Sequence, residues 1–319
     1  MNSIEKYLQS KGLSKATIKC YNAEIIEFIT WCDIQNIEPE NTTSTEVTGY
    51  LQHLQNKGQH NKTRKINLNI LKHYFDYQIS LQHRNTNPAE HIKIRGANTK
   101  QLYPIFTKQE LEALYTNYKL LLDDDINNKR NWFKTAQLGK QRNKAMINLM
   151  INQGLTTDEV NRLTTADIKL KEGKIYIAGT RKSNEREIEL KPHQIMELME
   201  YQLTTRKELV KYRNTAEETN LYFIPSTQAG KKTITNNDSI NVWKRLSQEI
   251  RAYNKKFINF QQVRASVITH WLKQYNLRQV QYMAGHRYVS STESYLINNV
   301  EELQKDIEMR LQRAKITVL

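Results

Sequence analysis

The 319-residue sequence lacks several features that would each define a class of protein. No apolar run approaches the roughly 18 residues of a membrane-spanning helix. The opening residues, MNSIEKYLQS, lack the apolar core of a secretory signal peptide. The chain has only two cysteines and no cluster of cysteine and histidine, which argues against a structural zinc site. We therefore expect no membrane segment, no bound metal and no cofactor.

The two cysteines, Cys20 and Cys32, fall within one predicted helix. They lie too far apart along that helix to form a disulfide, so we expect both thiols to be reduced. Reduced thiols are typical of the cytoplasm, which is the compartment that we predict.

Positive charge is the strongest feature of the composition. The formal net charge is +15 and the pI about 9.5. Such an excess of lysine and arginine favours a polyanionic partner. Because the chain has no evident membrane-binding segment, we favour nucleic acid over a lipid surface as this partner.

Residues 1–97 are predicted to form a helical domain, because their apolar residues recur at helical spacing. The turn Asn87-Pro88-Ala89 ends this pattern. Residues 98–106 form the predicted linker, and a second domain spans 107–319. Within this helical domain, we expect helices from Ile4 to Gln9, from Ser14, from Thr43 or Ser44, and from Lys62 to Leu81.

The second domain is predicted to be mainly helical with a small antiparallel sheet. A helix begins after Thr107, and residues 142–163 form two helices around Gly154. Residues 167–170, 174–178 and 185–190 alternate between apolar and polar side chains, as short strands do. Further helices follow from Pro192 and from Asn237 or Ser239, and a tail helix spans residues 301–313.

Residues 257–298 carry the most distinctive chemistry, in three predicted short helices. Gln261 and Arg264 share a helix face, His286 follows a helix end, and Tyr295 comes nine residues later. Arginine can grip a phosphate with two parallel donors, and histidine can donate to it or move a proton. Tyrosine can attack the phosphorus and become covalently attached. The set therefore suits the cleavage of a phosphodiester.

This stretch resembles the tyrosine recombinase or phage-integrase (Xer-like) family, whose pattern is His-x-x-Arg, then Leu-Gly-His, then Tyr. Here the matching residues are Gln261-Gln-Val-Arg264, Ala284-Gly285-His286 and Tyr295. The resemblance implies a helical core-binding domain followed by an α+β catalytic domain. It also implies a catalytic lysine in a hairpin turn, for which Lys182 is the better candidate and Arg181 the alternative.

Two positions depart from the family pattern. Gln261 replaces a histidine, and its amide still donates a hydrogen bond but cannot take a proton. Thr156 replaces an arginine in the turn Gly154-Leu155-Thr156, while the family acid remains as Glu159. Losing a donor to developing charge costs roughly 3–4 kcal/mol. We expect another cation to fill the gap, and Arg181 is the nearest candidate by its place in the hairpin.

The resemblance implies a site-specific recombinase that cleaves and rejoins double-stranded DNA through a covalent 3′-phosphotyrosine, without metal or nucleotide. Its partners would be DNA and further recombinase protomers, as a homo-oligomer (a tetramer on synapsed sites) or a hetero-oligomer with a related recombinase. Two alternatives remain open: a non-cleaving DNA-binding accessory protein, and a relative of type IB topoisomerases. The predicted DNA-binding residues are Lys62, Arg64, Lys65, Lys93 and Arg95.

Overall fold

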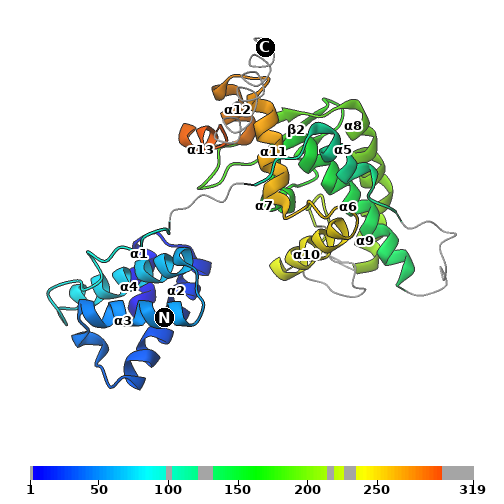
Figure 1. Cartoon of the computed structure of the whole chain (residues 1–319). Coiled ribbons are helices and arrows are strands. Elements are labelled where there is room, and N and C mark those ends of the chain that lie inside the picture. Colours follow the sequence, from blue (N-terminus) through cyan, green and yellow to red (C-terminus); the bar gives the residue numbers. More distant parts are fainter. Residues whose placement is uncertain (1–2, 98–102, 121–131, 214–218, 226–234, 297–319) are drawn as a thin grey trace, which may run out of the picture. The chain divides into compact units, whose positions relative to one another are not determined.

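The structure is a computed structural model that describes residues 3–97, 103–120, 132–213, 219–225 and 235–296. The chain divides into two compact units, residues 1–101 and 102–319 (Figure 1). The division falls within the segment predicted to be the linker. The tail helix expected at 301–313, and the first part of the predicted linker, lie outside the described residues.

The regular elements described in the first unit are all helices, as its apolar spacing predicted. Its aromatic core forms around Phe28, whose ring meets Tyr50, Tyr74 and Phe75 edge-on. Ser14 caps the long second helix by accepting from the backbone N–H of Thr17. The elements are α1 (Ser3–Ser10), α2 (Lys15–Ile34), the 3₁₀ turn η1 (Pro39–Asn41), α3 (Ser44–Asn56) and α4 (Asn61–Ser80).

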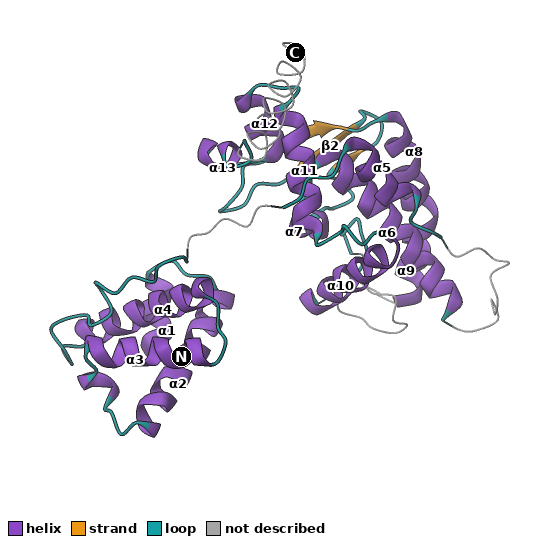
Figure 2. Ribbon diagram, viewed as in Figure 1, coloured by secondary structure: helices purple, strands orange, loops and turns teal. Residues whose placement is uncertain are grey.

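The second unit is mainly helical, and Figure 2 shows its strands as a small orange patch among helices. The predicted fold class is therefore confirmed. Its helices are α5 (Lys108–Thr116), α6 (Phe133–Gln153), α7 (Thr157–Arg162), α8 (Pro192–Glu200), the π-helix η2 (Tyr201–Thr205), α9 (Arg206–Arg213), α10 (Asn236–Tyr253), α11 (Phe260–Leu272), α12 (Leu277–Ala284) and α13 (Val289–Glu293).

Three short strands form one antiparallel sheet in the order β1 (Ile168–Lys169), β2 (Lys174–Ile177) and β3 (Arg186–Glu189). The register pairs Ile175 with Ile188 and Ile177 with Arg186. Because directly paired residues share one face of a sheet, Arg186 lies on the same face as the two buried isoleucines of β2. The sheet thus carries one arginine into the interior of the unit.

Helix α6 packs against α11, and together they supply much of the hydrophobic core of this unit. α6 begins at Phe133, nine residues before the predicted start, and ends where Gly154 adopts a left-handed conformation with φ of 57°. That reversal brings the segment from Gly154 to Glu159 back against α11. In the described parts of the chain, no helix is long and apolar enough to cross a membrane.

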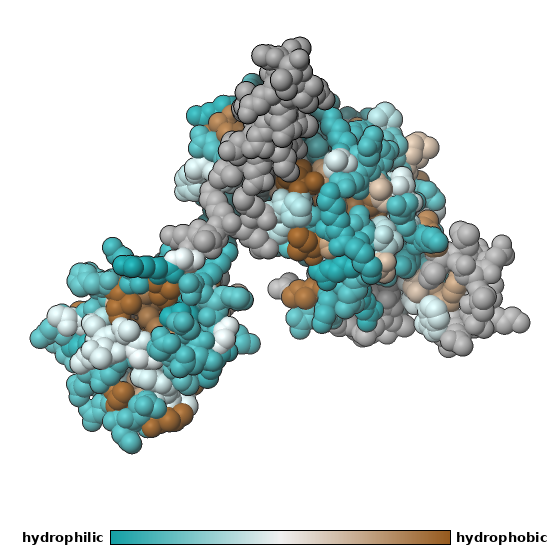
Figure 3. Space-filling view, viewed as in Figure 1, coloured by the Kyte–Doolittle hydropathy of each residue, from teal (hydrophilic) through white to brown (hydrophobic). Residues whose placement is uncertain are grey.

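The visible surface of both units is mostly hydrophilic, with small apolar patches (Figure 3). Exposed apolar side chains on α8 and η2 include Met196, Met199 and Leu203. Scattered apolar residues of this kind are normal on a protein surface.

Candidate active site

Three elements meet at the candidate site: helix α11, the turn after α12, and the hairpin between β2 and β3. Asn259 caps α11 by accepting from the backbone of Gln262, which fixes where the helix begins. Gly285 ends α12 in the left-handed conformation, with φ of 67°, that glycine adopts most readily. The chain then turns back and places His286 beside α11.

Arg264 is the central side chain of the site. It is buried on α11, where Nη1 donates to the Gly154 carbonyl at 2.5 Å and Nη2 donates to the Ala284 carbonyl at 2.7 Å. A carboxylate oxygen of Glu159 lies 3.5 Å from Nη1. The guanidinium is therefore held by carbonyls at the C-terminal ends of two helices, α6 and α12. Because a helix C-terminus carries a partial negative charge, it stabilises the positive charge of Arg264.

His286 lies between Arg264 and Thr292. Its Nε2 is 3.4 Å from Nη2 of Arg264, and its Nδ1 is 2.9 Å from the Thr292 hydroxyl. Because a guanidinium only donates, Nε2 carries the lone pair and the Nδ1 proton is donated to Thr292. Burial lowers the pKa of His286 to about 4, and the positive charges of Arg264 and Arg186 act in the same direction. The imidazole is therefore neutral at pH 7 in the DNA-free protein.

Tyr295 stacks on His286, with ring centroids 5.7 Å apart and planes 7° from parallel. Burial lowers the pKa of Arg264, and interactions with Glu159 and with the Tyr295 side chain oppose that shift. The tyrosine lies in a turn after α13, which ends at Glu293. The structure thus brings Arg264, His286 and Tyr295 into one cluster.

Thr156 is the N-cap residue of α7. Its hydroxyl accepts from the backbone N–H of Glu159 at 3.2 Å, and the Glu159 carboxylate in turn accepts from the Thr156 backbone N–H at 2.8 Å. This reciprocal pair is a capping box. The side chain at the altered family position is therefore engaged in starting a helix.

Glu159 lies between two arginines. One carboxylate oxygen accepts from Nη1 of Arg186 at 2.7 Å, and the other faces Arg264. Although burial raises the pKa of this carboxyl, the bond to Arg186 and the charges of both arginines hold it at about 2. Glu159 is therefore ionised at neutral pH.

Arg186 was not singled out from the sequence. The alternation Arg186-Glu-Ile188-Glu-Leu190 contains the signal that could have identified it, because residues two apart share a strand face. Ile188 and Leu190 are apolar and belong on the inward face, so Arg186 belongs there too. A charged residue that shares the inward face of a strand with apolar residues indicates a buried partner of opposite charge.

The β2–β3 hairpin reaches the histidine turn. Ser183 forms an isolated antiparallel bridge with His286, and the backbone N–H of Asn184 donates to the Gly285 carbonyl at 3.0 Å. Lys182, the residue before Ser183, is exposed in this turn. Arg181 is also exposed, and its carbonyl accepts from Arg287 at 2.9 Å. The hairpin thus brings Lys182 next to the residue that pairs with His286.

Gln261, at the start of α11, is exposed. Its side-chain oxygen accepts from the Tyr103 hydroxyl at 3.0 Å. Gln261 therefore lies on the same helix as Arg264, one turn earlier, and is held by the segment that enters the second unit.

The predicted DNA-binding residues lie in the first unit, in two segments that the fold brings together. Lys62, Arg64 and Lys65 begin α4, and the Asn61 side chain donates to the carbonyl of Arg95 at 3.0 Å. Lys93 and Arg95 are exposed on the second segment. Because a helix N-terminus adds partial positive charge, this combined surface, which we call the α4 basic patch, suits a phosphate backbone.

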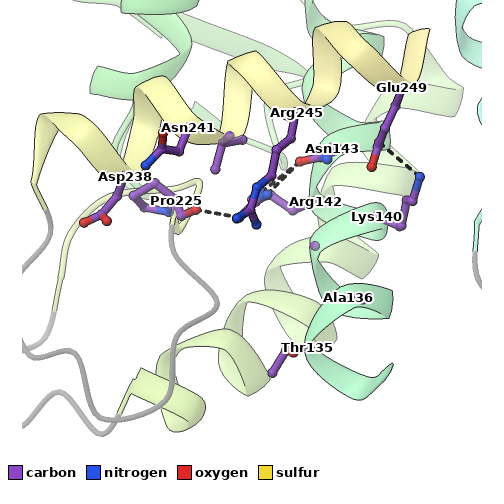
Figure 4. A pocket seen from close by; sticks show the side chains of 12 residues that line it. Thr135, Ala136, Lys140, Arg142, Asn143, Pro225, Asp238, Asn241, Arg245 and Glu249 are labelled. Carbon is purple, nitrogen blue, oxygen red and sulfur yellow. Dashed lines mark hydrogen bonds and ion pairs between the residues drawn. The ribbon is translucent and has the colours of Figure 1, made fainter. Parts of the chain in front are cut away.

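A polar pocket away from this cluster is lined by residues of α6 and α10 and by Pro225 (Figure 4). Its buried arginine, Arg142, donates to the carbonyls of Ile224 and Pro225 and to the Asn143 side chain. Lys140 pairs with Glu249 at 3.0 Å. Arg142 and Lys140 thus join segments of the fold. Among the described residues, no group of three histidine, cysteine or acidic side chains is placed to hold a metal ion.

A helical unit, an α+β unit and a cluster of tyrosine, histidine and buried arginine form the arrangement expected of a tyrosine recombinase. Comparison with known families agrees. The profile of the phage integrase family matches residues 105–302, and that of the phage integrase N-terminal SAM-like domain matches residues 1–82. The chain belongs to the phage integrase family, and the predicted resemblance is confirmed.

Individual relatives and structures extend the match over nearly the whole chain. The tyrosine recombinase XerD of Rickettsia prowazekii (strain Madrid E) is 25% identical over 313 residues, covering 95% of this chain and 93% of the relative. XerD of Halalkalibacterium halodurans is 25% identical over 303 residues, with 92% of each chain covered.

Among solved structures, the Tn1549 transposon integrase with circular intermediate DNA matches with a TM-score of 0.64 and 16% identity, covering 92% of this chain and 93% of that one. A lambda integrase tetramer bound to a Holliday junction matches with a TM-score of 0.60 and 16% identity, covering 92% and 75%. At this identity the likeness shows the fold.

Proposed function

We propose that this chain is a site-specific DNA recombinase that cleaves and rejoins DNA strands through a covalent bond between Tyr295 and a 3′ phosphate. The observation that carries the proposal is the contact cluster in which Tyr295 stacks on neutral His286 and both meet the buried Arg264. An attacking hydroxyl, a group able to move a proton and a fixed cation are the parts that this chemistry needs.

Each side chain has a role in the cleavage step. Arg264 and the Gln261 amide hold the phosphate by donating to its oxygens. The Tyr295 oxygen then forms a bond to phosphorus as the bond to the 5′ oxygen breaks. The Nε2 lone pair of His286 can accept the tyrosine proton, because this nitrogen is unprotonated at neutral pH.

Lys182 is the residue that we assign to the leaving group. An ammonium in the hairpin beside His286 can give its proton to the departing 5′ oxygen. In the reverse step a 5′ hydroxyl attacks the phosphotyrosine, Lys182 takes its proton, and Tyr295 leaves. The phosphotyrosine keeps the energy of the broken bond, so rejoining needs no nucleotide.

The partner that we propose is double-stranded DNA, bound by the α4 basic patch and by the second unit. The net charge of +15 supports this. So do the relatives, which are named as recombinases, and the similar structures, in which integrases are bound to DNA as a dimer or a tetramer. We accordingly propose that this protein acts as an oligomer on DNA. Its free cysteines, Cys20 and Cys32, agree with the cytoplasmic setting that we propose.

The alternative of a non-cleaving accessory protein has Thr156 as its main support. That residue is engaged in capping α7, while the tyrosine, histidine and arginine lie together. The relatives, which are named as recombinases and integrases, also favour cleavage.

Covalent trapping tests the proposal. The purified full chain is incubated with duplex DNA from the regions flanking its own gene, in the presence of a chelator, and the products are separated under denaturing conditions. We expect a protein–DNA adduct whose tryptic peptide contains Tyr295. Binding to that DNA without any adduct, on intact, nicked and junction substrates alike, would contradict the proposal and favour the accessory protein.

A further inference from the structure

Arg186 is a buried arginine with few partners. Its side chain is fully buried, and its Nη1 donates to Glu159 at 2.7 Å. Its Nε and Nη2 are buried without a hydrogen-bond partner among the described residues. Leaving a buried donor unpaired costs about 1–3 kcal/mol, more for a charged group, so this arrangement needs an explanation.

Arg142 shows how the same unit treats an arginine with a purely structural task. Its guanidinium is also buried, but Nε, Nη1 and Nη2 all donate, to two backbone carbonyls and to Asn143 (Figure 4). Arg186 instead donates to one carboxylate, that of Glu159, and its Nε and Nη2 have no hydrogen-bond acceptor among the described residues. The difference indicates that Arg186 serves something other than the joining of segments.

The position of Arg186 is tied to the candidate site through Gly285. A Cβ atom built on Gly285 would lie 2.3 Å from Nη1 of Arg186 and 2.9 Å from its Cζ. The guanidinium therefore packs directly against the backbone of the residue before His286. Its charge also reaches His286 and Arg264, since it acts to lower the pKa of both.

The charge balance of the cluster depends on Arg186. His286 is neutral, and Glu159 carries one negative charge that offsets the one positive charge of Arg264. Without Arg186, the charges of Arg264 and Glu159 would sum to zero, and the buried part of the site would carry no net positive charge. Adding Arg186 leaves the buried cluster with one net positive charge, at a place where the dielectric screening is weak.

We propose that Arg186 supplies the second positive charge of the phosphate site, in place of the arginine that the Gly154-Leu155-Thr156 turn lacks. The proposal rests on the proposed recombinase function. It assigns to β3 a task that the sequence suggested for Arg181 in the hairpin. Glu159 holds Arg186 in place, and Gly285 leaves room for it.

The first test separates charge from shape. Arg186→Met keeps most of the side-chain volume and removes the charge. Arg162→Met is the matched control, because Arg162 lies on the helix of Glu159 but pairs with Asp158 at the surface, at 3.1 Å. With wild-type cleavage as reference, we expect adduct formation to fall about a hundred- to a thousand-fold in Arg186→Met and less than threefold in the control.

The second test uses a DNA substrate in which a methyl group replaces one non-bridging oxygen of the cleaved phosphate, so that this phosphate is neutral. A neutral phosphate does not need a second cation. We therefore expect the defect of Arg186→Met to shrink to less than tenfold on this substrate. An equally large defect on both substrates would mean that Arg186 only positions other groups, and would overturn the proposal.

The third test restores the charge balance by a different route. Glu159→Gln removes the negative charge while its amide oxygen can still accept from the Thr156 backbone. The double variant Arg186→Met/Glu159→Gln again has one net positive charge, and we expect it to cleave at least tenfold faster than Arg186→Met. A double variant as slow as Arg186→Met, although folded by circular dichroism, would contradict the charge argument.

The outcomes also separate this inference from the function on which it rests. If wild type forms no adduct, the recombinase proposal and this inference both fail. If wild type and Arg186→Met cleave equally well while Arg181→Ala does not, only this inference fails, and the compensating cation is Arg181.

Discussion

Replacing Thr156 with arginine, the residue that the family pattern has there, should not improve this protein. The threonine is the N-cap of α7, and its hydroxyl and backbone both contact Glu159. Loss of a threonine N-cap costs about 1 kcal/mol, within a range of about 0.5–2 kcal/mol. The new guanidinium would also compete for a carboxylate that already holds Arg186 and contacts Arg264.

The magnitude follows from these two terms. Two like charges about 4 Å apart repel by about 4 kcal/mol at an effective dielectric constant of 20. The new side chain can turn toward solvent and avoid much of this repulsion. We therefore expect Thr156→Arg to lower the free energy of unfolding by about 1–3 kcal/mol and to reduce cleavage at least tenfold.

Thermal and chemical denaturation measure the first effect, and covalent adduct formation measures the second. Thr156→Ser, which keeps the capping hydroxyl, is the control and should differ little from wild type. In the Arg186→Met background the same Thr156→Arg change should instead raise cleavage, since the cation it replaces is gone. A variant in the wild-type background that keeps its stability and cleaves faster would refute this reasoning.

Three further predictions concern the same cluster and the DNA surface. Gly285→Ala should lower the free energy of unfolding by more than Gly12→Ala does in denaturant titrations, because both glycines have positive φ but only the Gly285 methyl group would collide with Arg186. Equal losses would contradict this. As the pH falls from 7 to 5, the free energy of unfolding of wild type should decrease by up to about 2 kcal/mol more than that of His286→Gln. The reason is that the imidazole, whose pKa is low in the folded protein, binds a proton in this pH range only in the unfolded chain. Parallel urea titrations check this, and identical pH profiles would exclude it. DNA affinity should fall steeply with salt concentration, and Lys62→Ala should reduce the slope of log K against log salt concentration by about 1. Filter binding at several salt concentrations measures this slope. An unchanged slope would mean that Lys62 contacts no phosphate.

The sequence predicted the parts of the fold that depend on neighbouring residues. Helix starts at Ser14 and Thr107 follow from side chains that cap within three residues, and both caps are observed. The turn at Gly154, which is left-handed, follows in the same way. The early start of α6 at Phe133 was missed, because its first turns carry polar residues without clear periodicity.

The site could be predicted only where a family pattern marked it. From the sequence alone, Arg264 cannot be distinguished from an ordinary helix residue. Its burial depends on the carbonyls of Gly154 and Ala284, which are distant from it in the sequence. Arg186 meets Glu159 across 27 residues, a pairing that no local spacing specifies. Such contacts arise from the packing of whole elements, which is why the proposed compensating charge emerged from the structure.

The identity of the nucleophile tests the central claim most directly. Tyr295→Phe removes one hydroxyl from the ring that stacks on His286, so the fold and DNA binding should persist. Tyr288→Phe removes a hydroxyl from an exposed tyrosine seven residues earlier and serves as the control. We predict that the covalent DNA adduct disappears in Tyr295→Phe and remains in Tyr288→Phe. An adduct that persists in Tyr295→Phe would contradict the account.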